Sequence, residues 1–153
     1  MTDLVITFLA SFLIWFMFAG LFVLWVTDGK IQREQVLHAL LAAGTAWVIA
    51  QIIKALFPTL RPFELNGIAP MVFLPSSDGA FPSGHSAAAF ALATSIFLHD
   101  KKVGLLYEVG AVTVGIARVL GNVHYPVDIL GGAIVGIVVA FVIEKVHLRK
   151  LTP

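Results

Sequence analysis

Phe81-Pro82-Ser83-Gly84-His85 leads from a polar, proline-bearing segment into the small-residue run Ser86-Ala87-Ala88-Ala89-Phe90-Ala91-Leu92-Ala93. Serine is favoured at the N-cap of a helix, so Ser83 predicts that a helix begins at Gly84. Because glycine has no side chain, the first backbone N–H groups of that helix stay open to an anion. His85 would lie in the first turn beside the anion, where an imidazole can donate or accept a proton. The small side chains that follow allow close packing, so we expect this helix at the centre of a bundle.

The whole chain has the composition of a membrane protein. Its 153 residues are 59% hydrophobic and 12% charged, with a mean hydropathy of +0.95. Apolar runs long enough to cross a bilayer recur along the sequence, which predicts an all-α, polytopic membrane helix bundle forming a single domain over residues 1–153. About five spans are expected, at about residues 4–26, 36–57, 84–98, 103–121 and 127–146. The absence of cysteine excludes disulfides, thiolate metal sites and a cysteine nucleophile.

Local features refine this picture. Met1-Thr2-Asp3 carries no positive charge and no small-residue cleavage site follows the first apolar run, so this run is expected to be a retained span and not a signal peptide.

The longest segment between spans, 59–82, has an apolar middle at Met71-Val72-Phe73-Leu74 that is too short to cross and is expected to dip into the membrane interface. The pairs Gly132-x-x-x-Gly136 and Ala111-x-x-x-Gly115 suit close helix packing, within the bundle in preference to a dimer. The oligomeric state stays open.

The basic residues indicate the orientation of the chain. If the spans alternate, seven of the ten Lys and Arg residues fall on one face: Lys30, Arg33, Lys101, Lys102, Lys145, Arg149 and Lys150. By the positive-inside rule this face is cytoplasmic, with the N-terminus outside and the C-terminus inside. The histidines at 38, 99 and 147 are expected towards this cytoplasmic face, and no function is assigned to them.

The other three cations need a different explanation. Lys54, Arg61 and Arg118 fall on the extracytoplasmic face, and two of them lie near the ends of apolar spans, where an unpaired cation is costly. A single such residue often only extends its charge to the lipid headgroups. Three cations, two histidines and a helix N-terminus on one face, with no comparable group of acidic residues, instead favour a bound phosphate group.

His124-Tyr125-Pro126-Val127-Asp128 supplies groups for chemistry on that phosphate. Pro126 favours a helix start, so Asp128 lies in the first turn and close to His124 in space. A carboxylate beside an imidazole fixes its tautomer and supports the charge that develops when the other nitrogen attacks. Taken alone, Asp128 could equally serve only to accept hydrogen bonds from the first turn of the helix.

Three motifs together resemble the signatures of the type-2 phosphatidic acid phosphatase family, which includes lipid phosphatases and the vanadium haloperoxidases. They are Lys54-x6-Arg61-Pro62, Pro82-Ser83-Gly84-His85 and Arg118-x5-His124-x3-Asp128. The resemblance implies a metal-independent phosphatase without a cofactor that acts on lipid phosphates through a phosphohistidine. It further implies that His124 is the nucleophile, that Asp128 orients it and that His85 is the general acid and then base. The phosphoryl oxygens would be held by Lys54, Arg61, Ser83, Gly84 and Arg118.

The sequence departs from the family pattern in two ways. Ala117 stands where the third motif usually opens with serine, which removes one hydroxyl contact to phosphate. Integral members usually have six spans, and about five are expected here. Because of these two departures, the family resemblance indicates the reaction more firmly than it indicates the lipid substrate.

Undecaprenyl diphosphate is the first choice of substrate, because its recycling needs a phosphatase on the outer face of a bacterial cytoplasmic membrane. Phosphatidylglycerol phosphate, phosphatidic acid and lipid A are alternatives. An anion transporter or channel is the alternative of another class, and it is disfavoured because the charges gather at one end of the spans and not near the midplane. A haloperoxidase is disfavoured by the membrane-embedded character. The expected partners are a lipid phosphate and the bilayer, with no nucleic acid.

Overall fold

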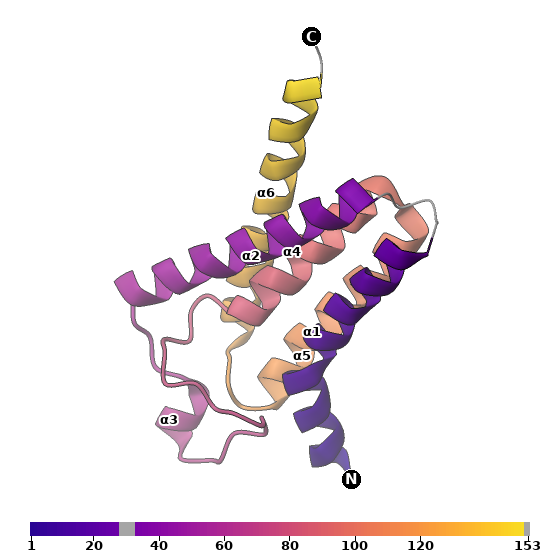
Figure 1. Cartoon of the computed structure of the whole chain (residues 1–153). Helices are drawn as coiled ribbons and strands as arrows, with labels where there is room; N and C mark the ends of the chain where they lie inside the picture. Colours follow the sequence, from indigo (N-terminus) through magenta and orange to yellow (C-terminus); the bar gives the residue numbers. More distant parts are fainter. Residues whose placement is uncertain (28–32, 152–153) are drawn as a thin grey trace.

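The chain folds into a bundle of helices (Figure 1). The computed structural model describes residues 1–27 and 33–151, with side chains described as far as residue 146. Within these residues there are six helices and no strand: α1 (Thr2–Val26), α2 (Arg33–Leu56), α3 (Pro62–Asn66), α4 (Gly84–His99), α5 (Lys101–Leu120) and α6 (Pro126–Leu151). The all-α prediction is confirmed.

Each of the five expected spans corresponds to a helix, but the helices differ in length. α1, α2, α5 and the Pro126–Val146 part of α6 are long and apolar enough to cross a membrane. α4 has 16 residues, which corresponds to roughly 24 Å along its axis, less than the thickness of a hydrocarbon core. The structure therefore has four helices of spanning length in its described part, and α4 is a shorter helix enclosed among them.

α4 is the central element, as its small residues predict. It packs against α2, α5 and α6, and α1 joins the bundle mainly through α5 (Figure 1). The alanines of α4 are almost completely buried, and they contribute to two core clusters, one with α1, α2 and α5 and the other with α2 and α6. Side chains this small bring the helix backbones close together.

The small-residue pairs serve this packing within the chain. A Cβ added to Gly132 would lie 2.5 Å from the backbone oxygen of Ser83, and one added to Gly136 would lie 2.4 Å from that of Ala87. Ala111 is fully buried, and a Cβ on Gly115 would lie 2.6 Å from a methyl carbon of Ile129. The preference for packing inside the bundle is confirmed.

The helix boundaries follow local capping rules. The Ser83 side chain accepts a hydrogen bond from the backbone N–H of Ser86, so the predicted N-cap of α4 is confirmed. At the other end, Asp100 closes α4 and caps α5, its carboxylate accepting from the N–H groups of Lys102 and Val103. Pro126 is the first residue of α6, as expected.

The long connection between α2 and α4 closes one end of the bundle. It contains the short helix α3, which begins at Pro62 after Arg61 and was not predicted from the sequence. Its apolar middle is fixed to the C-cap of α5 and to α1: the N–H of Met71 donates to the Gly121 carbonyl, and the N–H of Phe73 donates to Ser11 Oγ on α1. The expected dip of this segment into the membrane interface stays a prediction.

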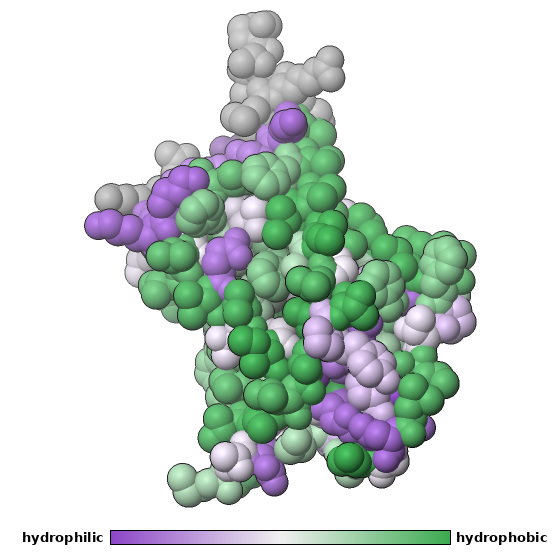
Figure 2. Space-filling model, turned by 180° about the vertical axis from the view of Figure 1, so that it is seen from behind, coloured by the Kyte–Doolittle hydropathy of each residue, from purple (hydrophilic) through white to green (hydrophobic). Residues whose placement is uncertain are grey.

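The surface agrees with a membrane environment. Figure 2 shows hydrophobic residues over the middle of the molecule and hydrophilic residues towards its two ends. Many large apolar side chains are exposed on α1, including Trp15 at 65% and Phe22 at 63% exposure. Such a surface is unfavourable in water and suited to contact with lipid chains.

Candidate active site

The predicted site residues gather at the end of the bundle closed by the α2–α4 connection, which we call the polar end. Each comes from a different local position: the last turn of α2, the residue before α3, the start of α4, the last turn of α5, the α5–α6 turn and the first turn of α6. In that order they are Lys54, Arg61, Ser83 with Gly84 and His85, Arg118, His124 and Asp128. Apart from the partly buried His85, all are buried.

His124 forms the expected pair with Asp128. Its Nδ1 lies 3.3 Å from Asp128 Oδ2, and its Nε2 lies 3.4 Å from Nη1 of Arg61. A carboxylate can only accept and a guanidinium can only donate, so the neutral imidazole carries its proton on Nδ1 and keeps the lone pair of Nε2 available. Asp128 Oδ2 also accepts from the backbone N–H of Tyr125 at 2.8 Å, so the carboxylate both orients the imidazole and fixes the start of α6.

The surroundings keep His124 neutral. Burial lowers the pKa of His124 to about 4, and the charges of Arg118, Arg61 and Lys54 act in the same direction, while the hydrogen bond to Asp128 opposes them. His124 is therefore an uncharged base at neutral pH. Only a neutral imidazole has the free lone pair that a nucleophile needs.

An acidic partner for two of the cations was missed. Asp78, in the α2–α4 connection, accepts from Lys54 Nζ at 2.7 Å through Oδ2 and from Arg61 Nη2 at 2.7 Å through Oδ1. No comparable group of acidic residues was expected beside the cations, and this one aspartate nevertheless pairs with both Lys54 and Arg61. The signal was a lone aspartate in a polar segment between two motifs, and nothing in its neighbourhood distinguishes it from an ordinary loop residue.

The Asp78 carboxylate is strongly held in its charged form. Partial burial alone would raise the pKa of Asp78, but hydrogen bonds from Lys54, Ser76 and Arg61, and the charge of Lys54, outweigh it and hold the pKa well below its usual range. The Asp78 side chain is 29% exposed, so it is closer to water than the two cations Lys54 and Arg61. It lies where an anionic ligand of the two cations would compete with it.

Arg61 is fully engaged by the protein. Besides Asp78 Oδ1 and His124, its guanidinium donates to the carbonyl oxygens of Asp78 at 3.0 Å, Val123 at 3.0 Å and Gly79 at 3.4 Å. It is 1% exposed. Arg61 thus fixes the connection and the His124 turn relative to each other, in addition to any contact it makes with a ligand.

The Arg118 guanidinium has N–H donors that the described part of the protein does not use. Its Nη1 donates to the backbone oxygen of Ala10 on α1 at 3.1 Å, while its Nε is buried and has no hydrogen-bond partner in the structure. Arg118 and His85 line a cavity of about 230 Å³, together with Ser11, Phe12, Trp15, Phe73 and Leu74. A buried guanidinium nitrogen without an acceptor is costly unless a ligand supplies one, so Arg118 is a candidate contact for an anion at this end of the bundle.

A second cavity reaches the same histidine from the apolar side. It measures about 350 Å³ and lies between α1, α2 and α4, lined by Ile14, Trp15, Phe18, Leu40, Ala43, Gly44, Trp47, His85 and Ala88. Apart from His85 and the indole N–H groups, its walls are hydrocarbon. His85 therefore lies between the cavity that contains Arg118 and an apolar one.

Ser83 and Gly84 form the remaining part of the predicted anion site. Ser83 Oγ accepts from the N–H of Ser86 at 3.3 Å and from Ser86 Oγ at 3.1 Å, so its observed contacts are those of a cap. Gly84 lies close to α2, where an added Cβ would be 3.3 Å from the Trp47 ring. Among the described residues, no three His, Asp or Glu side chains of the polar end are close enough together to hold a metal ion.

Comparison with known proteins identifies the family. The model of the PAP2 superfamily matches residues 35–151, which includes all three motifs. The chain belongs to the PAP2 superfamily. This confirms the resemblance to the type-2 phosphatidic acid phosphatases that the motifs indicate.

Three PAP2 relatives illustrate the similarity. The Bacitracin transport permease protein BcrC of Bacillus licheniformis is 34% identical over 140 residues, which cover 92% of this chain and 69% of that protein. The Undecaprenyl-diphosphatase BcrC of Bacillus subtilis is 27% identical over 121 residues, covering 79% of this chain and 62% of its own length. The crystal structure of Aquifex aeolicus LpxE superposes with a TM-score of 0.79 at 27% identity, covering 94% of this chain and 86% of that one.

The relatives' names refer to several lipid phosphates. Besides undecaprenyl-diphosphatase, further PAP2 matches are named phosphatidylglycerophosphatase B and lipid A 1-phosphatase. The similarity therefore supports a membrane lipid phosphatase and leaves the headgroup to be identified.

Proposed function

We propose that this protein is a membrane lipid phosphatase that removes the terminal phosphate of a lipid diphosphate, with undecaprenyl diphosphate as the substrate. The observation that carries the proposal is the position of His85, which borders both the cavity containing Arg118 and the apolar cavity between α1, α2 and α4. A lipid phosphate has a charged head joined to a long hydrocarbon chain. These two adjoining environments match the two parts of that molecule.

His124 is the nucleophile in this proposal. Its Nε2 lone pair attacks phosphorus while Asp128 holds the Nδ1 proton and stabilises the positive charge that develops on the ring. A P–N bond forms, the bond from phosphorus to the leaving oxygen breaks, and His85 gives that oxygen a proton. His85 then takes a proton from water, which attacks the phosphohistidine and releases inorganic phosphate.

The cations stabilise the negative charge on the transferring group. Arg118 is the cation most available to phosphate, because its Nε has no partner. Lys54 becomes available to phosphate when its ion pair with Asp78 breaks. Arg61, Ser83 and Gly84 complete the site as hydrogen-bond donors held in position by the fold. Substrate binding therefore exchanges one anion, the Asp78 carboxylate, for another. With this charge supplied by side chains, no metal or cofactor takes part in the chemistry.

The polar end is proposed to face the extracytoplasmic side of a bacterial cytoplasmic membrane. The support is the basic residues near the opposite end, such as Arg33, Lys101 and Lys102, which the positive-inside rule puts in the cytoplasm. Lys30, which belongs to the same set, lies outside the described residues. Undecaprenyl diphosphate released at the outer face would then meet the site directly.

Transport is the second candidate, since one relative is named a bacitracin transport permease protein. Substrate sites of transporters usually lie near the midplane of the membrane on interrupted helices. Here the buried cations and histidines are at one end, and a histidine–carboxylate pair suited to phosphoryl transfer lies among them. These features favour hydrolysis over transport.

A panel of lipids tests the proposal. Purified protein would be assayed for inorganic phosphate release from undecaprenyl diphosphate, phosphatidylglycerol phosphate, phosphatidic acid and lipid A in mixed micelles. We expect the highest kcat/KM with undecaprenyl diphosphate, activity that persists in EDTA and inhibition by vanadate, which imitates five-coordinate phosphorus. A higher kcat/KM for another lipid would reassign the substrate. Loss of activity in EDTA with recovery in Mg²⁺, assayed while the protein remains folded, would indicate metal-assisted hydrolysis.

A further inference from the structure

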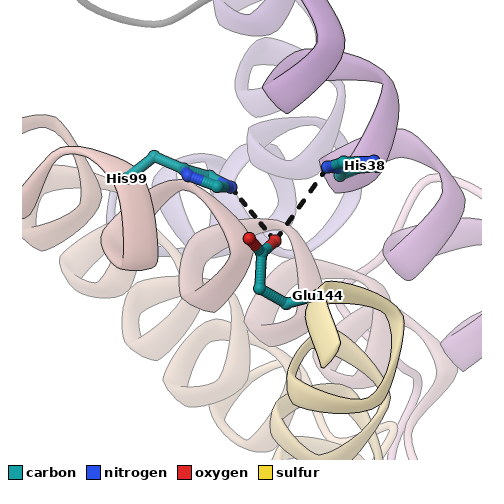
Figure 3. Close-up of side chains that lie close together, drawn as sticks. All are labelled: His38, His99 and Glu144. Carbon is teal, nitrogen blue, oxygen red and sulfur yellow. Dashed lines mark hydrogen bonds and ion pairs between the residues drawn. The ribbon is translucent and has the colours of Figure 1, made fainter. Parts of the chain in front are cut away.

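A second group of titratable side chains lies at the opposite end of the bundle, and the proposed chemistry does not use it. His38 near the start of α2, His99 at the end of α4 and Glu144 on α6 point towards one another (Figure 3). His99 Nε2 lies 3.1 Å from Glu144 Oε2, and His38 Nδ1 lies 4.0 Å from the same oxygen. We call these three residues the His–His–Glu cluster.

We propose that the His–His–Glu cluster binds a divalent transition-metal ion, with Zn²⁺ as the expected metal. Each residue offers one ligand atom, and the three atoms lie within 4.8 Å of one another. Ligands at about 2.0–2.2 Å from a tetrahedral Zn²⁺ are themselves roughly 3.3–3.6 Å apart. The pair formed by His99 and Glu144 already has about this spacing, and a shift of about 1 Å by the His38 ring would complete the geometry.

The donor set matches the proposed ion. Two imidazoles and one carboxylate are ligands that zinc accepts, whereas magnesium and calcium prefer oxygen ligands alone. His38 is 8% exposed, and the side chains of His99 and Glu144 are each 16% exposed. The cluster is thus shielded on most sides but still reached by water, which can provide a fourth ligand.

An ion pair alone accounts less well for this arrangement. Glu144 Oε2 faces both imidazoles, and its distance of 4.0 Å from His38 Nδ1 is too long for a hydrogen bond. A metal ion placed among the three ligand atoms would contact each of them. The arrangement therefore suits a shared cation better than two separate pairs.

The position of the cluster gives the ion a structural function. The cluster joins α2, α4 and α6, and these helices carry Lys54, His85 and Asp128 at their other ends. Holding the three helices together at one end limits how far they can separate at the other. The ion would thus raise the stability of the bundle without touching the phosphate, and its binding does not depend on the proposed function.

Metal binding is measured on the whole protein, purified with a tag that contains no histidine and treated with chelator. Equilibrium dialysis should find one Zn²⁺ per chain, and Co²⁺ should give the visible absorption of a low-coordinate nitrogen and oxygen site. Zn²⁺ at a hundredfold excess over its Kd should raise the Tm by roughly 5 °C or more. Glu144→Gln should weaken Zn²⁺ binding by at least about tenfold.

Two control variants separate this site from others. Glu108→Gln makes the same chemical change on α5, where Glu108 accepts a hydrogen bond from Thr94 outside the cluster, and it should bind Zn²⁺ like the wild type. His124→Ala should also keep the ion. Absence of stoichiometric Zn²⁺ binding by the wild type would overturn the proposal, as would full binding by Glu144→Gln. Loss of the ion in His124→Ala would assign it to the polar end instead. If Glu144→Gln does not fold, the wild-type Co²⁺ spectrum and Zn²⁺ binding by His38→Gln are measured instead. The proposal then requires the absorption of a low-coordinate site in the wild type and weaker Zn²⁺ binding in His38→Gln.

Discussion

His124 illustrates how neighbours define the chemistry of a single side chain. Asp128 contacts its Nδ1 and Arg61 contacts its Nε2, and together these neighbours specify that Nδ1 carries the proton. Burial among cations then keeps the ring neutral, with a pKa of about 4. The imidazole is therefore ready to attack at neutral pH without first losing a proton.

The titration of His124 can be measured directly. We expect ¹⁵N NMR of histidine-labelled protein in micelles, assigned with His124→Gln, to give a midpoint near pH 4 instead of 6.5. Between these values the unfolded chain binds a proton at this position and the folded chain does not, so acidification through this range should lower the free energy of unfolding. A midpoint near 6.5 would mean that the ring is exposed to water in solution.

Asp78 is expected to compete with phosphate for Lys54 and Arg61. Asp78→Asn keeps the size of the side chain and removes its charge, so vanadate should bind roughly tenfold more tightly, the equivalent of about 1.4 kcal/mol. The Tm should fall, because two buried cations lose a charged partner. Glu64→Gln is the matched control, since Glu64 accepts from the backbone N–H of Arg61 and not from its side chain. Weaker vanadate binding in Asp78→Asn would show that Asp78 organises the site and does not compete.

At the scale of elements, α4 explains why the site can be assembled at all. Its small side chains let α2, α5 and α6 approach closely, and their ends supply Lys54, Arg118 and Asp128 around the start of α4. The backbone of Ser83 donates to the Asp128 carbonyl at 2.9 Å, which ties the N-cap of α4 to the first turn of α6. Packing and site geometry are therefore connected.

Two glycines provide a matched test of this packing. A Cβ on Gly136 would meet the backbone of α4 at 2.4 Å, whereas one on Gly44 would meet nothing within 4 Å. Gly136→Ala should lower the free energy of unfolding by about 1–3 kcal/mol through overpacking. Gly44→Ala should raise it by about 0.5–1 kcal/mol, because alanine favours the helix. Equal effects on the Tm of the two variants would contradict the close α4–α6 contact.

The sequence predicted the long helices well and the connection between α2 and α4 poorly. Apolar length defines α1, α2, α5 and α6, and Ser83 and Pro126 mark the starts of α4 and α6 by local rules. α3 has only five residues, and at its start the Glu64 carboxylate accepts a hydrogen bond from the backbone N–H of Arg61. The bridge from Asp78 to Lys54 and Arg61 joins positions 24 and 17 residues apart, which no local pattern reveals.

At the scale of the whole molecule, the surface has an apolar middle between two polar ends of different character (Figure 2). One end holds the buried cations and histidines of the PAP2 motifs. The opposite end carries Arg33, Lys101 and Lys102 as exposed residues, together with the His–His–Glu cluster. Because exposed positions lie at both ends, labelling from one side of the membrane can test the proposed orientation.

Single cysteines report which end faces outwards, because the chain contains none. Ser77→Cys lies at the polar end and Lys102→Cys at the other, and both positions are exposed. In intact cells we expect a membrane-impermeant maleimide to label position 77 and not 102, with both labelled after permeabilisation. The reverse pattern in intact cells would contradict the orientation and put the site in the cytoplasm.

The proposed function depends on the transfer of phosphate from the lipid to His124. It is tested most directly by rapid quench with terminally ³²P-labelled undecaprenyl diphosphate and an activated phosphate ester, using wild type, His124→Ala and His85→Ala in proteoliposomes. We expect an acid-labile phosphoenzyme in the wild type and none in His124→Ala with either substrate. In His85→Ala the activated ester should still form the phosphoenzyme, which should accumulate because the water lacks its base. Label on His124→Ala and none on His85→Ala would contradict this mechanism and make His85 the nucleophile.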